Sequence, residues 1–116
     1  IADLQRYTND AIQAGVKPEH IILDPGIGFA KSYQQNLYLM NNLRTIVELG
    51  YPVLLGTSRK SVIGLTLGLP PEERLEGTAA TIALGIAQGC GIVRVHDVQA
   101  IKRLAVMSDA IIRSTL

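Results

Sequence analysis

The chain alternates between helical patterns and short, wholly apolar runs. Between Asp3 and Ala14, apolar side chains recur at helical spacing, and Gly15 and Pro18 are placed to end this predicted helix. The run Ile21–Leu23 has no polar face, so it predicts a strand that is buried on both sides. We expect the buried face of the first helix to consist of Leu4, Tyr7, Ala11 and Ile12.

The same cycle continues after the first strand. Ser32 and Gln35 form a capping-box pattern, which predicts the start of a helix that Gly50 ends. A second apolar run, Val53–Leu55, predicts the second strand, and Ser58–Ser61 follow it. We expect the buried stripe of the helix between the strands to consist of Leu37, Met40, Leu43 and Val47.

A third cycle completes the chain. A predicted loop containing Gly64 and Gly68 leads into a small-residue helix that ends near Gly89. The run Ile92–His96 predicts the third strand, and Asp97 is placed to cap a final helix. The apolar face of that last helix is expected to contain Ile101, Leu104, Ala105, Ser108, Ile111 and Ile112.

The resulting order, one helix followed by three strand–helix units, is typical of an α/β fold with parallel strands and crossover helices. The length of 116 residues suits one domain, and 47% hydrophobic residues exclude a disordered chain. The chain opens without Met, directly in a predicted helix, so we expect it to be a piece of a longer polypeptide.

Charge and cysteine content narrow the possible functions. A net charge of +1 argues against a nucleic-acid-binding protein built on a basic face. No apolar run reaches the roughly 18–20 residues of a membrane span, so we expect no membrane partner. The single cysteine, Cys90, forms no internal disulfide; we interpret it as a small buried residue, and a reducing compartment fits.

Polar side chains gather where each predicted strand ends. These are Asp24 after the first strand, Ser58–Ser61 after the second, and Arg94, His96 and Asp97 on the third. The carboxyl ends of parallel strands meet at one edge, where α/β proteins bind ligands. We therefore expect these residues to form one binding rim.

The rim residues suggest an anion or a polar heterocycle as the ligand. Asp24 can accept hydrogen bonds from an aminopyrimidine-like edge, whereas Lys60 and Arg94 can hold an anion or a carbonyl oxygen. Ser61 favours a carboxylate or phosphate if a helix begins there. The glycines of the 25–29 loop allow the main chain to pass close to a ligand, and Phe29 can pack on a planar ring.

Structural roles remain open for each of these residues. Asp24 can be a turn or cap residue, Lys60 a solvated side chain, and His96 a structural histidine. Arg94 can form an ion pair with Asp24 or Asp97. The segment Glu72–Arg74 is interpreted as a solvated helix start.

Three motifs together resemble dihydropteroate synthase. They are Leu23–Lys31 (LDPGIGFAK), Gly56–Ser61 (GTSRKS) and Arg94–Val98 (RVHDV), with 36 residues from Asp24 to Lys60 and 34 from Lys60 to Arg94. The resemblance covers nearly the whole chain. It implies that residues 1–116 are part of a pterin-binding (β/α)8 TIM barrel, namely strands six to eight with their helices.

The resemblance implies an activity: condensation of 7,8-dihydropterin-6-ylmethyl pyrophosphate with p-aminobenzoate, which gives 7,8-dihydropteroate and pyrophosphate in folate biosynthesis. It implies catalytic roles for Asp24, Lys60 and Arg94. By the same resemblance, Asp24 hydrogen-bonds the pterin, Lys60 meets its carbonyl and ring nitrogen, and Arg94 covers the pterin and helps to hold the pyrophosphate. The further substrate-binding residues are His96 at the pyrophosphate, Gly56 at the pocket floor, and Phe29 and Ser61 near the p-aminobenzoate.

The family also implies Mg²⁺ at the pyrophosphate, with its ligand residue outside this segment, sulfonamides as competitors of p-aminobenzoate, a homodimer, and a cytoplasmic location. The family's N-terminal motifs are absent from this sequence, and three strands cannot close a barrel. We therefore expect the chain alone to have little or no synthase activity.

Two other functions and one other fold are considered. One function is a non-catalytic pterin-binding fragment. The other is a domain of the methyltetrahydrofolate–corrinoid methyltransferase class, which the Ser58–Ser61 string disfavours. A flavodoxin-like open sheet is the alternative fold.

Overall fold

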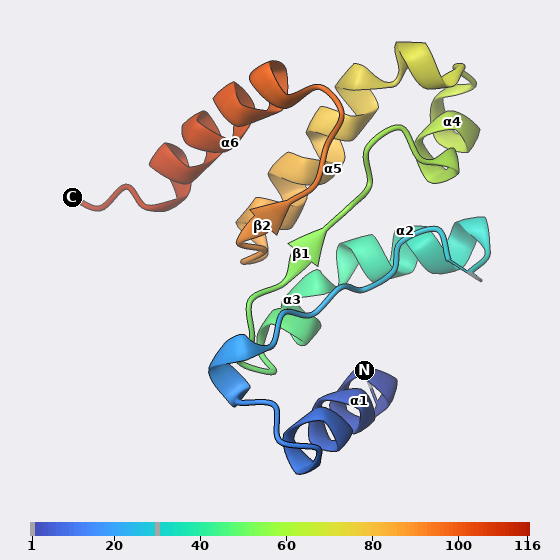
Figure 1. Ribbon diagram of the computed structural model, residues 1–116. Helices are drawn as coiled ribbons and strands as arrows, with labels where there is room; N and C mark the ends of the chain where they lie inside the picture. The colour runs from blue at the N-terminus through green and yellow to red at the C-terminus, as the bar shows by residue number, and fades with distance from the viewer. Residues whose placement is uncertain (1, 30) are drawn as a thin grey trace.

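Three short parallel segments form the centre of the computed structural model, which describes residues 2–29 and 31–116. Strand β1 (Leu54–Leu55) pairs in parallel with β2 (Ile92–Val93), and Leu23 forms a parallel bridge with Val53. The Leu54 nitrogen donates to the Leu23 carbonyl at 2.8 Å, whereas the Arg94 nitrogen donates to the Leu55 carbonyl at 3.1 Å. The middle segment therefore has a neighbour on each side, and the predicted parallel order is confirmed (Figure 1).

Helices separate the three segments. In the described residues, the α-helices are α1 (Ala2–Gln13), α2 (Tyr33–Asn41), α3 (Leu43–Val47), α4 (Ser61–Leu67), α5 (Leu75–Ala87) and α6 (Val98–Ile112), and the short 3₁₀ helices are η1 (Pro18–His20) and η2 (Pro71–Glu73). Within the described part of the chain, no helix has both the length and the apolar character to cross a membrane.

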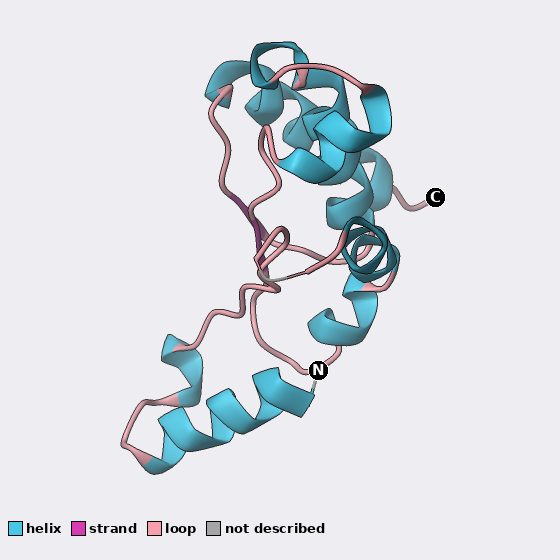
Figure 2. Cartoon of the chain, turned by 90° about the vertical axis from the view of Figure 1, so that its right-hand side faces the viewer, coloured by secondary structure: helices cyan, strands magenta, loops and turns pink. Residues whose placement is uncertain are grey.

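The strands are shorter and less enclosed than predicted. Leu23 is buried, but Ile22 is 56% exposed, so the prediction of burial on both sides is wrong for the first strand. Figure 2 shows the strands at the left of the upper part of the molecule, with helices to their right. The molecule is only 22 Å thick, and the buried core, built around Leu55 and Ile82, lies between strands and helices.

Glycines in α5 bring this helix against the strands and α4. A Cβ atom on Gly85 would clash with the side chain of Leu55, and one on Gly77 would clash with Ile63. These two positions therefore use their small size for packing inside the chain.

The single helix predicted from Ser32 to Gly50 is broken. Ser32 forms the predicted capping box with Gln35, but α2 ends at Asn41 because Asn42 leaves the helical conformation (φ −129°, ψ 24°). The Asn42 side chain donates to the Tyr38 carbonyl at 2.8 Å, a local bond that competes with the helix. Of the predicted stripe, Leu43 is buried, whereas Leu37 is 38% exposed.

A helix also occupies part of the predicted loop. Helix α4 includes Gly64, and the left-handed Gly68 (φ 69°) ends it. The guanidinium of Arg74 lies where a Cβ of residue 64 would stand, so glycine is required for this contact. Arg74 donates to the carbonyls of Leu69 and Arg59 at 2.9 Å each, so the interpretation of Glu72–Arg74 as a solvated helix start is wrong for Arg74.

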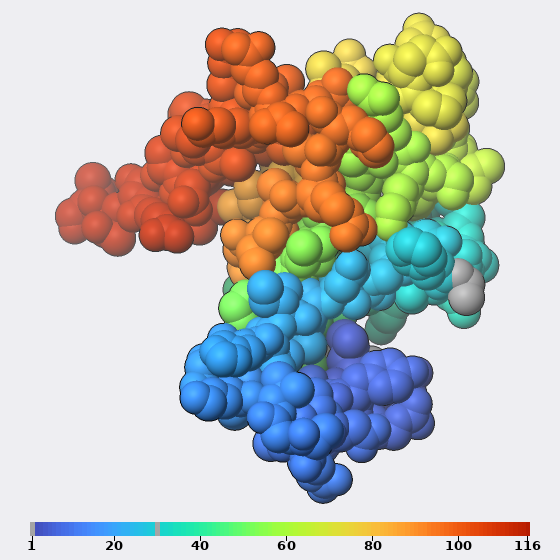
Figure 3. Space-filling view, viewed as in Figure 1, coloured from blue at the N-terminus to red at the C-terminus, as the bar shows by residue number. Residues whose placement is uncertain are grey.

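The terminal helices keep much of their predicted apolar faces exposed. In α1, Tyr7 is 59% exposed and Thr8 is the buried residue. In α6, Ile101 is buried against the core, whereas Ile111 is 64% exposed. Figure 3 shows the end of α6, in red, projecting from the rest of the molecule.

Candidate active site

The predicted rim residues come together at the carboxyl ends of the three parallel segments. The Nη2 atom of Arg94 lies 3.9 Å from Oδ2 of Asp24. Gly56, Lys60, Arg94 and His96 line one pocket of about 150 Å³, together with Ser58 and Val95. Residues from three separate segments of the sequence thus share one edge, as the strand order requires.

Asp24 is fixed by its own loop. Its Oδ1 accepts a hydrogen bond from the Gly26 nitrogen at 2.8 Å, which is an Asx-turn contact, while Oδ2 faces Arg94. The carboxylate is exposed and remains able to accept hydrogen bonds. Of the two predicted partners for Arg94, the structure therefore selects Asp24 rather than Asp97.

The loop from Gly26 to Phe29 is held by side chains from three directions. Lys31 Nζ donates to the Gly26 carbonyl at 2.9 Å, and Asn36 Oδ1 accepts from the Gly28 nitrogen at 2.9 Å. Lys60 Nζ donates to the Ile27 carbonyl. Asn36, which is only 4% exposed, is a positioning residue that we did not predict, because nothing in the sequence distinguishes it from the other polar residues of its helix.

Lys60 spans from the second segment to this first loop. Its Nζ lies 4.6 Å from the centre of the Phe29 ring, a cation–π contact. Partial burial lowers the pKa of Lys60 from its ordinary value of 10.5, and Arg94 and Lys31 lower it further, while Asp24 opposes the shift. Lys60 is thus a positioned ammonium rather than the solvated side chain of the alternative interpretation, and Phe29, at 65% exposure, keeps surface available for a ligand ring.

The residue before Lys60 adopts an unusual backbone conformation. Arg59 has φ 57°, the left-handed region that non-glycine residues rarely occupy. Its nitrogen donates to Thr78 Oγ1 at 3.1 Å, its carbonyl accepts from Arg74 at 2.9 Å, and its side chain pairs with Asp97 at 3.1 Å. These three contacts fix the turn that directs Lys60 towards the first loop.

Asp97 has a different role from the predicted one. It stands at the N-cap position of α6, but its side chain makes no capping hydrogen bond. The carboxylate instead binds the Arg59 guanidinium, which a position-by-position reading of the sequence cannot reveal.

Arg94 and His96 line the pocket from the third segment. The Arg94 guanidinium lies against Gly56, where a Cβ would stand 2.7 Å from Nη2. The His96 Nδ1 atom is 2.7 Å from Oγ of Ser58. Ser61 is the first residue of α4, so a helix does begin at Ser61, and it enters the segment that we predicted to be a loop.

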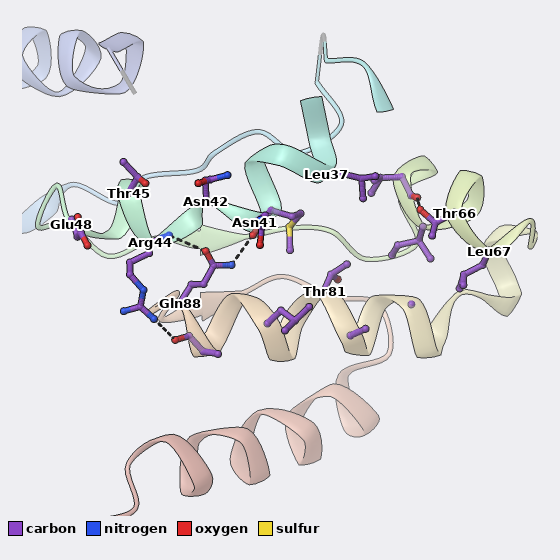
Figure 4. Close-up of a pocket in the computed structure, with 17 residues that line it drawn as sticks. Leu37, Asn41, Asn42, Arg44, Thr45, Glu48, Thr66, Leu67, Thr81 and Gln88 are labelled. Atoms are coloured by element: carbon purple, nitrogen blue, oxygen red, sulfur yellow. Dashed lines mark hydrogen bonds between the residues drawn. The ribbon is translucent and has the colours of Figure 1, made fainter. Parts of the chain in front are cut away.

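A larger cavity of about 830 Å³ lies between α2 and α3 on one side and α4 and α5 on the other (Figure 4). In Figure 4, Gln88 and Arg44 cross one end of it, and Gln88 donates to the Met40 carbonyl. None of the predicted rim residues lines this cavity, so the smaller pocket is the candidate site.

Comparison with known proteins assigns the chain to a family. A model of the family described as pterin binding enzyme matches residues 1–96. The chain belongs to the pterin-binding enzyme family. Its motifs at Asp24, Lys60 and Arg94 all lie within the matched residues.

Similar proteins in this family are dihydropteroate synthases. The chain is 62% identical over 112 residues to the synthase of Clostridium beijerinckii. The aligned region covers 96% of this chain and 42% of that protein. A solved synthase from Clostridium difficile, in the presence of pteroic acid, matches with 52% identity and a TM-score of 0.92 over 95% of this chain and 42% of that one. The Thermus thermophilus synthase, solved with 4-aminobenzoate, matches with 39% identity and a TM-score of 0.88. This match covers 94% of this chain and 44% of that one.

These solved relatives are TIM barrels, so the three βα units have the fold of one portion of a barrel. The flavodoxin-like alternative is therefore wrong. The chain spans about two fifths of the length of the relatives it matches.

Proposed function

We propose that this chain supplies the pterin-binding and pyrophosphate-binding edge of a dihydropteroate synthase. The observation that carries the proposal is the convergence of Asp24, Lys60, Arg94 and His96 from three parallel segments onto one edge. The substrates are 7,8-dihydropterin-6-ylmethyl pyrophosphate and p-aminobenzoate. The similarity to synthases at up to 62% identity supports this choice over the methyltransferase class.

In the proposed reaction, the bond between the pterin methylene carbon and the pyrophosphate oxygen breaks, and the amine nitrogen of p-aminobenzoate bonds to that carbon. The nitrogen then loses one of its hydrogens as a proton to solvent. Positive charge develops on the methylene and negative charge on the departing pyrophosphate. Arg94 and His96 stabilise the departing anion, because fixed donors cost no reorganisation during the reaction. Asp24 accepts hydrogen bonds from the pterin and favours the developing cation, and Lys60 donates to the pterin carbonyl and ring nitrogen, with Gly56 forming the floor.

Phe29 and Ser61 are proposed to contact p-aminobenzoate. The Phe29 ring is exposed beside Lys60, where it can pack against a benzoate ring. Ser61 can donate its hydroxyl hydrogen to the carboxylate. Sulfonamides are proposed to compete here, supported by a Yersinia pestis synthase solved as a sulfonamide drug complex.

Mg²⁺ does not fit the residues of this edge. Lys60 and Arg94 are cations, His96 offers nitrogen, and Asp24 already faces Arg94, whereas Mg²⁺ prefers several oxygen ligands. Residues 2–29 and 31–116 contain no group of three or more His, Cys, Asp or Glu placed to share a metal ion. We propose Mg²⁺ at the pyrophosphate only for the whole enzyme, with its ligand residue outside this segment.

A homodimer and a cytoplasmic location complete the proposal. The cavity between the α2/α3 and α4/α5 helices, with Leu84 exposed to 63% on its wall, is an apolar surface that a second subunit can cover. The unpaired thiol of Cys90 is compatible with a reducing compartment.

Calorimetric titration of the chain with pteroic acid tests the proposal. We expect binding that weakens at least about tenfold, or about 1.4 kcal/mol, in Lys60→Ala. Lys102→Ala is the matched control, because Lys102 is an exposed lysine on α6 that does not line the pocket at the rim. Absence of binding, or equal loss in both variants, contradicts the proposal.

A condensation assay separates the synthase from the non-catalytic alternative. The chain alone is expected to bind pteroic acid without condensing the two substrates. If the full-length natural protein also binds pteroic acid but fails to condense the substrates, the non-catalytic alternative is correct.

A further inference from the structure

Ser58 and His96 form a close contact between the segments that follow β1 and β2. The Ser58 Oγ atom lies 2.7 Å from His96 Nδ1 and 3.1 Å from the main-chain nitrogen of the same histidine. Ser58 is only 8% exposed, and both residues line the 150 Å³ pocket at the rim. One buried hydroxyl therefore meets both the ring and the backbone of the histidine.

The positions of the hydrogens follow from counting donors and acceptors. The His96 main-chain nitrogen can only donate, so it takes one lone pair of Ser58 Oγ. In the part of the chain that the structure describes, the only other hydrogen-bond partner of this oxygen is Nδ1. If Nδ1 carried the ring hydrogen, Oγ would accept twice and its own hydrogen would be left without an acceptor, which costs about 1–3 kcal/mol in a buried group.

The opposite arrangement satisfies every group. The hydroxyl accepts from the main chain and donates its hydrogen to Nδ1, which then has no hydrogen of its own. The neutral ring must carry its hydrogen on Nε2. His96 can then donate from Nε2 without carrying a positive charge.

We propose that Ser58 is a positioning residue that fixes His96 in the Nε2–H form and thereby supplies the pocket with a neutral hydrogen-bond donor for a phosphate oxygen. The identity of that anion as pyrophosphate rests on the proposed function, whereas the tautomer does not. The donor complements the Arg94 guanidinium on the same pocket, which supplies the charge.

Imidazole nitrogen spectra of the ¹⁵N-labelled chain test the tautomer directly, under mildly alkaline conditions in which imidazole is neutral. His20 is the only other histidine and serves as an internal reference. We expect the His96 ring hydrogen on Nε2 in the unmodified chain. A spectrum with the hydrogen on Nδ1 overturns the proposal without the need for any variant.

Variants then separate positioning from mere structural support. Ser58→Ala is expected to leave His96 as a mixture of tautomers, and Ser58→Thr, which keeps the hydroxyl, is expected to restore Nε2–H. Ser32→Ala is the matched control: it removes a capping hydroxyl from α2 and destabilises the chain, but it leaves the His96 spectrum unchanged. If Ser58→Ala leaves the tautomer as it was, Ser58 does not position the ring.

Titration with inorganic pyrophosphate connects the tautomer to the site. Ser58→Ala is expected to weaken pyrophosphate binding by roughly tenfold, with Ser58→Thr and Ser32→Ala within about twofold of the unmodified chain. Equal affinity in Ser58→Ala and the unmodified chain overturns the role of Ser58 in anion binding. Confirmed Nε2–H with no pyrophosphate binding in the unmodified chain instead overturns the anion assignment of the proposed function.

Discussion

The main-chain nitrogen of Arg59 donates a hydrogen bond to Oγ1 of Thr78, 3.1 Å away on α5. Thr78 is fully buried, and Arg59 occupies the left-handed region at φ 57°. That conformation costs a non-glycine residue roughly 1–2 kcal/mol. The contact therefore helps to hold a strained residue next to Lys60, the lysine that reaches across the rim.

Thr78→Val tests this support, because valine keeps the shape and removes the acceptor. The Arg59 N–H is then left without its partner, and we expect a loss of about 1–3 kcal/mol in the free energy of unfolding. Lys60 is expected to lose its fixed direction, so pteroic acid should also bind more weakly. Urea unfolding and calorimetry measure the two effects, and Thr78→Ser, which keeps the hydroxyl, should retain most of the affinity. A Thr78→Val chain with unchanged affinity for pteroic acid would show that Thr78 does not direct Lys60.

The order of elements and the gathering of the rim residues were predictable from the sequence. Each apolar run is followed by a polar side chain, and parallel connection brings Asp24, Lys60 and Arg94 to the same edge. Two helix ends were also predictable from the sequence. The capping box at Ser32 and the left-handed conformation of Gly15 (φ 103°) depend only on neighbouring residues.

The contacts that hold the rim in place were not predictable. Arg74 resembles a charged residue at a helix start, yet it packs on Gly64 and binds the Arg59 carbonyl. Asp97 resembles a cap, yet it pairs with Arg59. These partners lie 15 and 38 residues from Arg59 in the sequence, and no local pattern identifies a partner at that distance. A threonine within a largely aliphatic helix, such as Thr78, is the kind of signal that could have indicated one of them.

Lys60 should titrate below the exposed lysines. Burial lowers its pKa, with smaller lowering effects from Arg94 and Lys31, so its ammonium loses its proton at a lower pH than in the unfolded chain. Holding the charged ammonium in the folded chain costs free energy at any pH below the pKa of Lys60 in the folded chain. This cost is relieved as the pH rises from that lowered pKa towards 10.5, the ordinary value. The stability contributed by Lys60 therefore rises with pH between the two pKa values. A ¹³C NMR titration of the lysine side chains, with Lys17 and Lys102 as references, measures the shift.

Asp24→Asn provides the matched change for this titration. The amide oxygen can still accept from the Gly26 nitrogen, so the turn is kept while the charge is lost. Because Asp24 opposes the lowering of the Lys60 pKa, its removal should move the Lys60 titration to still lower pH. A shift to higher pH, or no shift, contradicts this electrostatic coupling.

Cys90 should react slowly in the folded chain. Its side chain is 5% exposed, and burial raises the pKa of its thiol, so both access and the thiolate fraction are reduced. We expect a thiol-specific disulfide reagent to modify it much more slowly in buffer than in denaturant, because reaction requires opening of the core. Equal rates in the two solvents would mean that the Cys90 region is open in solution.

Gly56→Ala should disturb the rim while leaving the fold nearly intact. The new Cβ atom would stand 2.7 Å from Arg94 Nη2, and a long, exposed side chain can move away at little cost. We therefore expect a change within about 0.5 kcal/mol in the free energy of unfolding, as for most substitutions outside special features. The displaced guanidinium loses its place beside Asp24, so pyrophosphate affinity should fall roughly tenfold. Gly91→Ala is the matched control, because a Cβ there meets nothing within 4 Å. Unfolding curves and calorimetric titrations of the two variants decide the matter: unchanged affinity in Gly56→Ala would show that the space above Gly56 does not set the position of Arg94.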